Sequence, residues 1–190
     1  MSETVGDPMA GPRAPRRVIT AMRQGRAVFA EDGPVPNAHH YTAIPGMMTS
    51  VVYATAAPPP LLQGEAEAAP PGLHIPPGPG ETRLMVVTSP PDTTMARPEF
   101  DPAAADAEQR ERIPGLAELL EPDVPGMHRT ETVDYDIVLD GEIWLELDDG
   151  ATAHLHRGDI AVQCGTRHAW RHKGDCPATL CFVLIGGAPA

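Results

Sequence analysis

Positive charge is scarce in this sequence of 190 residues. Lysine and arginine number 14 against 26 aspartate and glutamate residues, which gives a formal net charge of −12, and Lys173 is the only lysine. Proteins that bind nucleic acid need clustered basic residues against the phosphates, and anionic membrane surfaces attract polybasic segments. The composition therefore excludes a nucleic-acid partner and a polybasic contact with a membrane.

Long apolar runs and cysteines are also few. No run approaches the roughly 18 residues that a membrane-spanning helix needs, and the N-terminal MSETVGDPMAGPRAPRR lacks the apolar segment of a secretory signal. The three cysteines, Cys164, Cys176 and Cys181, are odd in number and have no CxxC spacing. We expect a cytoplasmic protein whose cysteines are reduced and behave as small buried hydrophobes.

Proline and glycine are abundant instead, with 23 and 18 residues. Because proline removes a backbone donor and glycine adds conformational entropy to the unfolded chain, long helices are scarce in such a sequence. We therefore expect an all-β fold of short antiparallel strands joined by turns. Strands are predicted at 16–22, 26–30, 48–55, 82–88, 130–139, 142–148, 151–156, 159–163, 168–172 and 178–185.

The sequence divides into three parts. Residues 1–15 are proline, glycine and polar residues, so we expect a disordered tail there. Residues 16–122 contain N-terminal strands, a proline-rich surface loop over 57–80 and a helical insertion over 101–121. Residues 123–190 hold the most regular succession of strands and turns, and we expect the core of the fold and its chemistry there.

The helical insertion has clear boundary signals. Asp101 can cap its first turn, Pro102 suits the first helical position, and Pro114 is expected to break the segment into two pieces. Its acidic and alanine-rich composition indicates a solvated insertion without a catalytic role.

Polar side chains alternate along residues 126–141 and form the strongest candidate site. Side chains of a strand point to opposite faces in turn, so His128, Thr130, Asp134 and Asp136 share one face. By the same rule, the neighbouring glutamate and tyrosine of this segment lie on the opposite, solvent-facing side.

A second imidazole, His168, follows His128 forty residues later. Two imidazoles and one carboxylate are the ligands of a facial site for a divalent first-row metal, with open positions for substrate or water. We therefore predict His128, Asp134 and His168 as metal ligands. The predicted catalytic residues, which would position substrate or move a proton, are Asp136, Thr130 and Gln163.

These two segments resemble the paired motifs of the cupin superfamily. The first motif, G(X)5HXH(X)3–4E(X)6G, is matched by His128, by Asp134 in the glutamate position and by Gly141. The second motif ends in PXG(X)2H(X)3N and is matched by Gly165 and His168. On this resemblance, residues 123–190 are the cupin core that carries both motifs.

Several positions depart from the motifs. Thr130 replaces the second histidine of the first motif, and Asp134, one methylene shorter than glutamate, reaches less far into the barrel. Gln163 replaces the proline of the second motif, His172 its asparagine, and Pro122 the leading glycine of the first. A hydroxyl is a poor metal ligand, but it can hold a metal-bound water, and Gln163 or a water can complete the ligand shell.

The resemblance implies a cupin-type antiparallel β-barrel, or jelly roll, with a short helical insertion, commonly as a homodimer. It also implies an enzyme that uses divalent iron, manganese, zinc or nickel on a small organic molecule. Within that range we favour an oxygenase over an isomerase, decarboxylase or lyase, because three facial ligands leave open coordination positions. Two alternatives stay open: a cupin that binds a small molecule without catalysis, and a metal-independent epimerase or cyclase with His128 or His168 as general base.

Two further histidines, His154 and His156, lie on one face of a predicted strand. An i, i+2 histidine pair can bind a metal, but no carboxylate of matching position accompanies this pair in the sequence. We therefore expect both residues, and His172, to be structural or solvent-facing.

Overall fold

The computed structural model describes residues 12–59, 61 and 72–188. Most of the predicted disordered tail, residues 1–11, and residues 60 and 62–71 of the proline-rich loop therefore lie outside the described residues. Among the helices that are described, none has the length and apolar character to cross a membrane.

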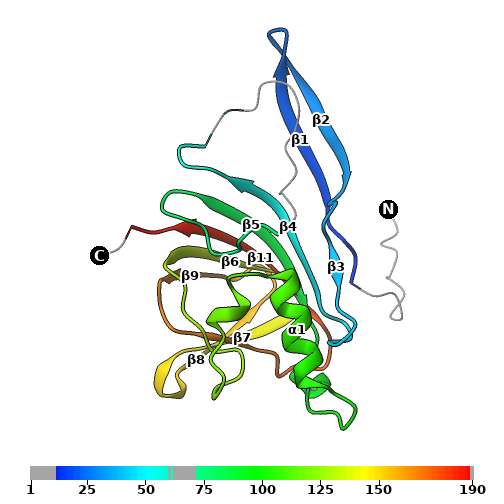
Figure 1. Cartoon of the computed structure of the whole chain (residues 1–190), viewed down its shortest axis with the longest axis vertical. Helices are drawn as coiled ribbons and strands as arrows, with labels where there is room; N and C mark the ends of the chain where they lie inside the picture. The colour runs from blue at the N-terminus through cyan, green and yellow to red at the C-terminus, as the bar shows by residue number, and fades with distance from the viewer. Residues whose placement is uncertain (1–11, 60, 62–71, 189–190) are drawn as a thin grey trace.

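A six-stranded antiparallel sheet forms the larger wall of the molecule (Figure 1). Its strand order is β3-β4-β5-β11-β6-β9. In that order the strands span His39–His40, Met48–Thr55, Thr82–Ser89, Ala178–Gly186, Thr132–Asp140 and Ile160–Cys164. The central strands are rich in β-branched residues, which pack well on a pleated surface.

A three-stranded sheet lies against the larger one. Its order is β10-β7-β8, with bounds Ala169–Arg171, Glu142–Glu146 and Thr152–His156. Val138 and Leu180 of the large sheet and Ile143 of the small sheet belong to one buried cluster, so the two sheets pack face to face. The predicted all-β antiparallel jelly-roll fold is confirmed, and within the described part of the chain the two ladders stay separate rather than joining into a closed barrel.

The N-terminal hairpin projects from this body (Figure 1). Strands β1 (Arg16–Arg23) and β2 (Arg26–Pro34) are joined by Gln24 and Gly25, both at positive φ, 51° and 74°, as a tight hairpin turn requires. Arg17 anchors the hairpin to β4, because its Nη1 donates a hydrogen bond of 2.9 Å to the carbonyl of Val52. The strand β2 runs past the predicted range of 26–30.

The helical insertion forms as predicted. Helix α1 (Pro102–Arg112) is capped by the Asp101 carboxylate, which accepts hydrogen bonds from the amides of Ala103 and Ala104. It ends before Pro114, and a short 3-10 turn, η2 (Ala117–Leu119), follows. Two further 3-10 turns are η1 (Asp92–Thr94) and η3 (Asp148–Gly150).

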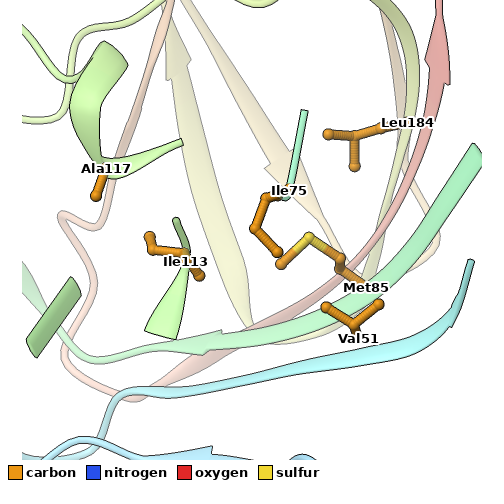
Figure 2. Close-up of a cluster of buried hydrophobic side chains, with 6 residues drawn as sticks. All are labelled: Val51, Ile75, Met85, Ile113, Ala117 and Leu184. Carbon is orange, nitrogen blue, oxygen red and sulfur yellow. The ribbon is translucent and has the colours of Figure 1, made fainter. Parts of the chain in front are cut away.

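The segment after α1 covers the inner face of the large sheet. Figure 2 shows Ile113 and Ala117 packed with Met85 and Leu184 of the sheet and with Ile75 of the loop before β5. All five side chains are at least 94% buried. The insertion therefore supplies a third apolar wall beside the two sheets.

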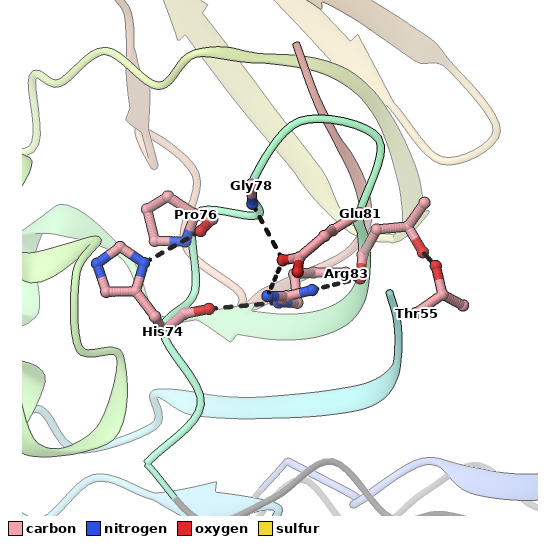
Figure 3. Close-up of polar contacts among 7 residues, drawn as sticks. Thr55, His74, Pro76, Gly78, Glu81 and Arg83 are labelled. Carbon is pink, nitrogen blue, oxygen red and sulfur yellow. Dashed lines mark hydrogen bonds and ion pairs between the residues drawn. The ribbon is translucent and has the colours of Figure 1, made fainter. Parts of the chain in front are cut away.

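Arg83 on β5 holds the loop of residues 72–81 against the sheet (Figure 3). Its buried guanidinium donates to the Glu81 carboxylate at 2.8 Å and to the carbonyl of His74 at 3.3 Å. Glu81 also accepts a hydrogen bond from the amide of Gly78. The loop then passes very close to Gly186, the last residue of β11. A Cβ atom added to Gly186 would lie 1.8 Å from the Gly78 carbonyl oxygen.

A substitution at Gly186 therefore tests whether the loop packs directly against the end of β11. We expect Gly186→Ala to destabilise the protein by at least about 1–3 kcal/mol, because the new methyl group meets backbone rather than a side chain that can move away. Denaturant unfolding followed by circular dichroism measures the change. Gly33→Ala is the matched control, because a Cβ at Gly33 has no atom within 4 Å; equal stability of the two variants would contradict the packing.

Candidate functional site

His128 and His168 lie side by side at the mouth of the space between the sheets. An isolated antiparallel bridge joins them: the amide of each donates a hydrogen bond of 2.9 Å to the carbonyl of the other. Their ring centroids are 4.4 Å apart. The pairing of the two segments that the motifs predicted is therefore made by the backbone itself.

Both rings are oriented through Nδ1. This atom lies 3.0 Å from the carbonyl oxygen of Gly126 in His128 and 2.9 Å from that of Thr166 in His168. A carbonyl only accepts, so in the neutral ring the proton sits on Nδ1 and the Nε2 lone pair faces away from it. In metal-binding histidines the ring nitrogen that does not bind the metal commonly donates its hydrogen to such a carbonyl or carboxylate oxygen, which fixes the orientation of the ring.

Burial keeps both imidazoles neutral. It lowers the pKa of His128, and it lowers the pKa of His168 to about 4, with a further lowering from the neighbouring His128. Both Nε2 atoms are therefore unprotonated at neutral pH and are available as ligands or as bases.

Strand β6 supplies two carboxyl groups to the same space. Asp134 and Asp136 are buried while Tyr135 between them is exposed, as the predicted alternation requires. One oxygen of each group, Oδ1, is buried without a hydrogen-bond partner among the described residues. Burial raises the pKa of Asp134 and raises that of Asp136 to about 7, with a further rise from the charge of Asp134.

Gln163 and Thr130 complete the polar side of the site. Gln163 Nε2 donates a 2.9 Å hydrogen bond to Asp136 Oδ2, and its Oε1 accepts one of 3.4 Å from Thr166. The hydroxyl of Thr130 lies 2.7 Å from that of Thr132. Gln163 therefore positions the Asp136 carboxyl group, and Thr130 occupies the position of the missing second histidine with a hydroxyl that is already paired.

All six predicted site residues line one cavity of about 150 Å³. Its remaining lining is mostly apolar, with Thr49 and Ser89 as the polar exceptions among Met47, Met85, Val87, Ile113, Leu116, Ile143, Trp170, Leu180, Phe182 and Leu184. The contribution of Ile113 and Leu116 was not predicted, because no pattern in the sequence shows that the segment after the helix folds back over this cavity. The cavity suits a small, largely apolar molecule with a polar group at one end.

The polar atoms fit a divalent cation in their chemistry. Two unprotonated imidazole nitrogens and two buried carboxylate oxygens without partners are groups that a dication satisfies. The ligand atoms of His128, Asp134 and His168 are nevertheless not all within 4.8 Å of one another, since the one trio in the described residues that meets this spacing lies elsewhere.

That trio corrects one expectation from the sequence. Glu142 on β7 does accompany His154 and His156 on β8, with the ligand atoms of all three within 4.8 Å of one another. His172 is not solvent-facing: only 2% of its surface is exposed, and neither ring nitrogen has a hydrogen-bond partner among the described residues.

The cysteines also differ from expectation. All three are free thiols, as predicted, but Cys164 and Cys176 are exposed and Cys181 is only half-buried. The prediction of small buried hydrophobes is therefore wrong for the two exposed residues. Cys164 lies on β9, where side chains that alternate with buried Gln163 face solvent.

The raised pKa of Asp136 predicts a pH-dependent stability. The folded protein takes up the proton near pH 7 and the unfolded chain near 3.8, so the free energy of unfolding falls as pH rises through this interval. Asp136→Asn removes that loss. Relative to wild type, chelator-treated Asp136→Asn should gain on the order of 2 kcal/mol more at pH 8 than at pH 5.

Scanning calorimetry at the two pH values measures this gain. Asp140→Asn, an exposed change on the same strand, is the control and should show no such dependence. A gain from Asp136→Asn that is the same at pH 5 and pH 8 would contradict the protonated carboxyl group.

No protein-family model matches the chain. Among curated proteins, a 64-residue segment is 54% identical to phomopsin biosynthesis cluster protein C' of Diaporthe leptostromiformis, covering 33% of this chain and 34% of that protein. Another match, of 66 residues, is 36% identical to the cupin-domain-containing oxidoreductase virC of Hypocrea virens, with 33% and 34% covered. The chain thus spans about a third of the length of these two relatives.

A longer match covers most of the chain. Over 187 residues, 94% of this chain and 75% of the relative, the sequence is 25% identical to the cupin-domain-containing oxidoreductase fogC of Aspergillus ruber.

Among solved structures, the chain is similar to the cupin_2 domain of an XRE family transcriptional regulator from Enterobacter cloacae. The TM-score is 0.33 and the identity 11%, over 57% of this chain and 83% of that one. A cupin 2 conserved barrel domain protein from Salinispora arenicola has a TM-score of 0.33 and 14% identity over 62% and 69% of the two chains.

The relatives named for a cupin domain agree with the two motifs that carry His128 and His168, and together they support assignment of the chain to the cupin superfamily.

Proposed function

We propose that this protein is a metal-dependent cupin enzyme that acts on a small, largely apolar organic molecule, with an oxidative reaction favoured. The observation that carries the proposal is the pair of imidazoles, His128 and His168, whose Nε2 atoms are unprotonated and whose Nδ1 atoms are fixed by backbone carbonyls. Relatives named as oxidoreductases and as biosynthesis cluster proteins support an enzymatic role in making a small molecule.

His128, His168 and Asp134 would hold the metal, which is iron, manganese, zinc or nickel in its divalent form. When bound, such an ion supplies Lewis acidity and, for iron, manganese or nickel, redox chemistry. The apolar walls would hold the body of the substrate and exclude water, while Asp134 balances part of the positive charge.

Asp136 is proposed as the group that moves a proton. It is fully buried, its Oδ1 has no hydrogen-bond partner within the described part of the chain, and its pKa of about 7 suits a group that both gives and takes a proton at neutral pH. Gln163 donates to Oδ2 and thereby leaves Oδ1 as the atom that exchanges the proton. Thr130 is proposed to orient substrate through its hydroxyl.

A second candidate function is a metal-independent epimerase or cyclase. It is favoured by the spacing of the predicted ligands, which do not all lie within 4.8 Å of one another. In that case neutral His168 would act as general base, with protonated Asp136 as general acid. A third reading, a cupin that binds its ligand without catalysis, would use the same cavity.

Metal content and turnover separate these functions. We expect His168→Ala to lose one equivalent of metal per chain, measured by elemental analysis after dialysis, because removing one imidazole leaves too few ligands in the cavity. The comparison is made in the His154→Ala/His156→Ala background, which removes both histidines of the trio formed with Glu142. Turnover is followed by mass spectrometry of a metabolite mixture, and it should be lost on chelation and restored by one of the four metals.

The exposed His40→Ala variant is the control and should keep both metal and turnover. Metal that stays bound at full stoichiometry in His168→Ala would refute the ligand assignment. Turnover that survives chelation would instead establish the acid–base enzyme, and a ligand that is bound but never converted would establish the binding protein.

We also propose that two copies associate through the projecting β1–β2 hairpin. Phe29 on β2 is 76% exposed, and Val18 and Met22 on β1 are also exposed, an arrangement that is costly in water. Light scattering on the full chain should give a dimer, and Phe29→Asp should shift it toward the monomer. An exposed polar change on the same hairpin, Gln24→Ser, is the control; a monomeric wild-type protein would refute this assembly.

A further inference from the structure

The outer face of the small sheet carries a second cluster of metal-ligating side chains. Glu142 on β7 lies opposite His156 on β8, and Trp144 lies opposite His154 in the same ladder. Ile143 and Leu155, which alternate with them, pack in the core between the sheets. The cluster therefore points away from the cavity, on the other side of the same sheet.

One carboxylate oxygen lies between the two imidazoles of this cluster. Glu142 Oε2 is 2.9 Å from His154 Nε2 and 3.8 Å from His156 Nε2. The two rings are 4.1 Å apart between centroids. A single ion can therefore contact both nitrogens and the carboxylate with only small side-chain movements.

Neighbouring groups contact both histidines. The carboxylate of Asp159 accepts a 2.8 Å hydrogen bond from the amide of His156, and the same oxygen lies 3.8 Å from His156 Nδ1. The ring of His154 stacks on Trp144 at 3.8 Å with 10° between the planes. The Trp144 ring thus limits the orientations open to His154, and Asp159 holds the backbone of His156 and places a negative charge near its ring.

We propose that Glu142, His154 and His156 form a surface site for one divalent transition metal ion, such as Zn²⁺, Ni²⁺ or Cu²⁺. Two imidazoles and one carboxylate favour these ions over Mg²⁺ and Ca²⁺, which take oxygen ligands. The ion would tie β7 to β8, and its remaining positions would face solvent. This site is separate from the cavity and does not depend on the function proposed for it.

The two tryptophans of the chain allow metal binding at the surface site and in the cavity to be measured independently. Trp144 stacks on His154 of the surface site. In the cavity, the ring centroids of Trp170 and His168 are 6.3 Å apart. In Trp170→Phe, the remaining fluorescence comes from Trp144. We expect Ni²⁺ or Cu²⁺ added to the metal-free protein to quench it in a saturable manner, with one ion per chain.

Two substitutions in that background identify the ligands. His156→Ala and Glu142→Gln leave the Trp144–His154 stack in place, and each should weaken binding at least about tenfold. His40→Ala, an exposed histidine elsewhere, should leave the binding curve unchanged. Competition with Zn²⁺ should restore the fluorescence, because a diamagnetic closed-shell ion occupies the same ligands.

Trp144→Phe provides the converse experiment. There Trp170 reports on the cavity, and its response to metal should be unaffected by His156→Ala, so a failure of the cavity site and a failure of the surface site give different results. Quenching of Trp144 that rises without saturation, or that is unchanged by both His156→Ala and Glu142→Gln, would overturn the proposal.

Discussion

The backbone bridge between His128 and His168 is the interaction on which the candidate site depends. Two hydrogen bonds of 2.9 Å bring together residues that are forty positions apart, and they fix the two imidazoles 4.4 Å apart at the edge of the two sheets. Because the bridge is made by main-chain atoms, it does not constrain which side chains follow it. The replacement of a motif histidine by Thr130 therefore changes the ligand set without changing the architecture.

Burial shifts the pKa values of the histidine and aspartate side chains in opposite directions, and in both cases it favours the uncharged form. It lowers the pKa of His168 and raises that of Asp136, because the apolar cavity disfavours the charged form of each. Without a cation, the cavity thus holds a neutral His168 and an Asp136 carboxyl group that is about half protonated at pH 7. A dication bound there, as proposed, would favour the ionised carboxyl groups, so its binding would release protons and its affinity would rise with pH as Asp136 ionises.

Much of this could be predicted from the sequence, because strand alternation and motif spacing are local. The alternation placed His128, Thr130, Asp134 and Asp136 on one face, and all four line the cavity. The apolar wall from Ile113 and Leu116 could not be predicted in the same way. Those residues follow a helix whose polar composition indicates only a solvated insertion, and their burial depends on how the chain after α1 folds back onto β5 and β11.

The carboxylate partner of the surface histidines could not be found from the predicted strand ends. Strands over 142–148 and 151–156 leave a two-residue turn, which would pair Glu142 with Arg157 and place His156 on the other face. In the structure the connection has three residues, Asp148–Gly150, and this shift of one residue brings Glu142 opposite His156. A search along one strand misses a ligand that belongs to its neighbour. The same register puts Trp144 and His154 on one side of the sheet and Ile143 on the other. An ion bound outside would therefore tie β7 to β8 without taking a ligand from the cavity, which is lined by Ile143 from the other face of the same strand.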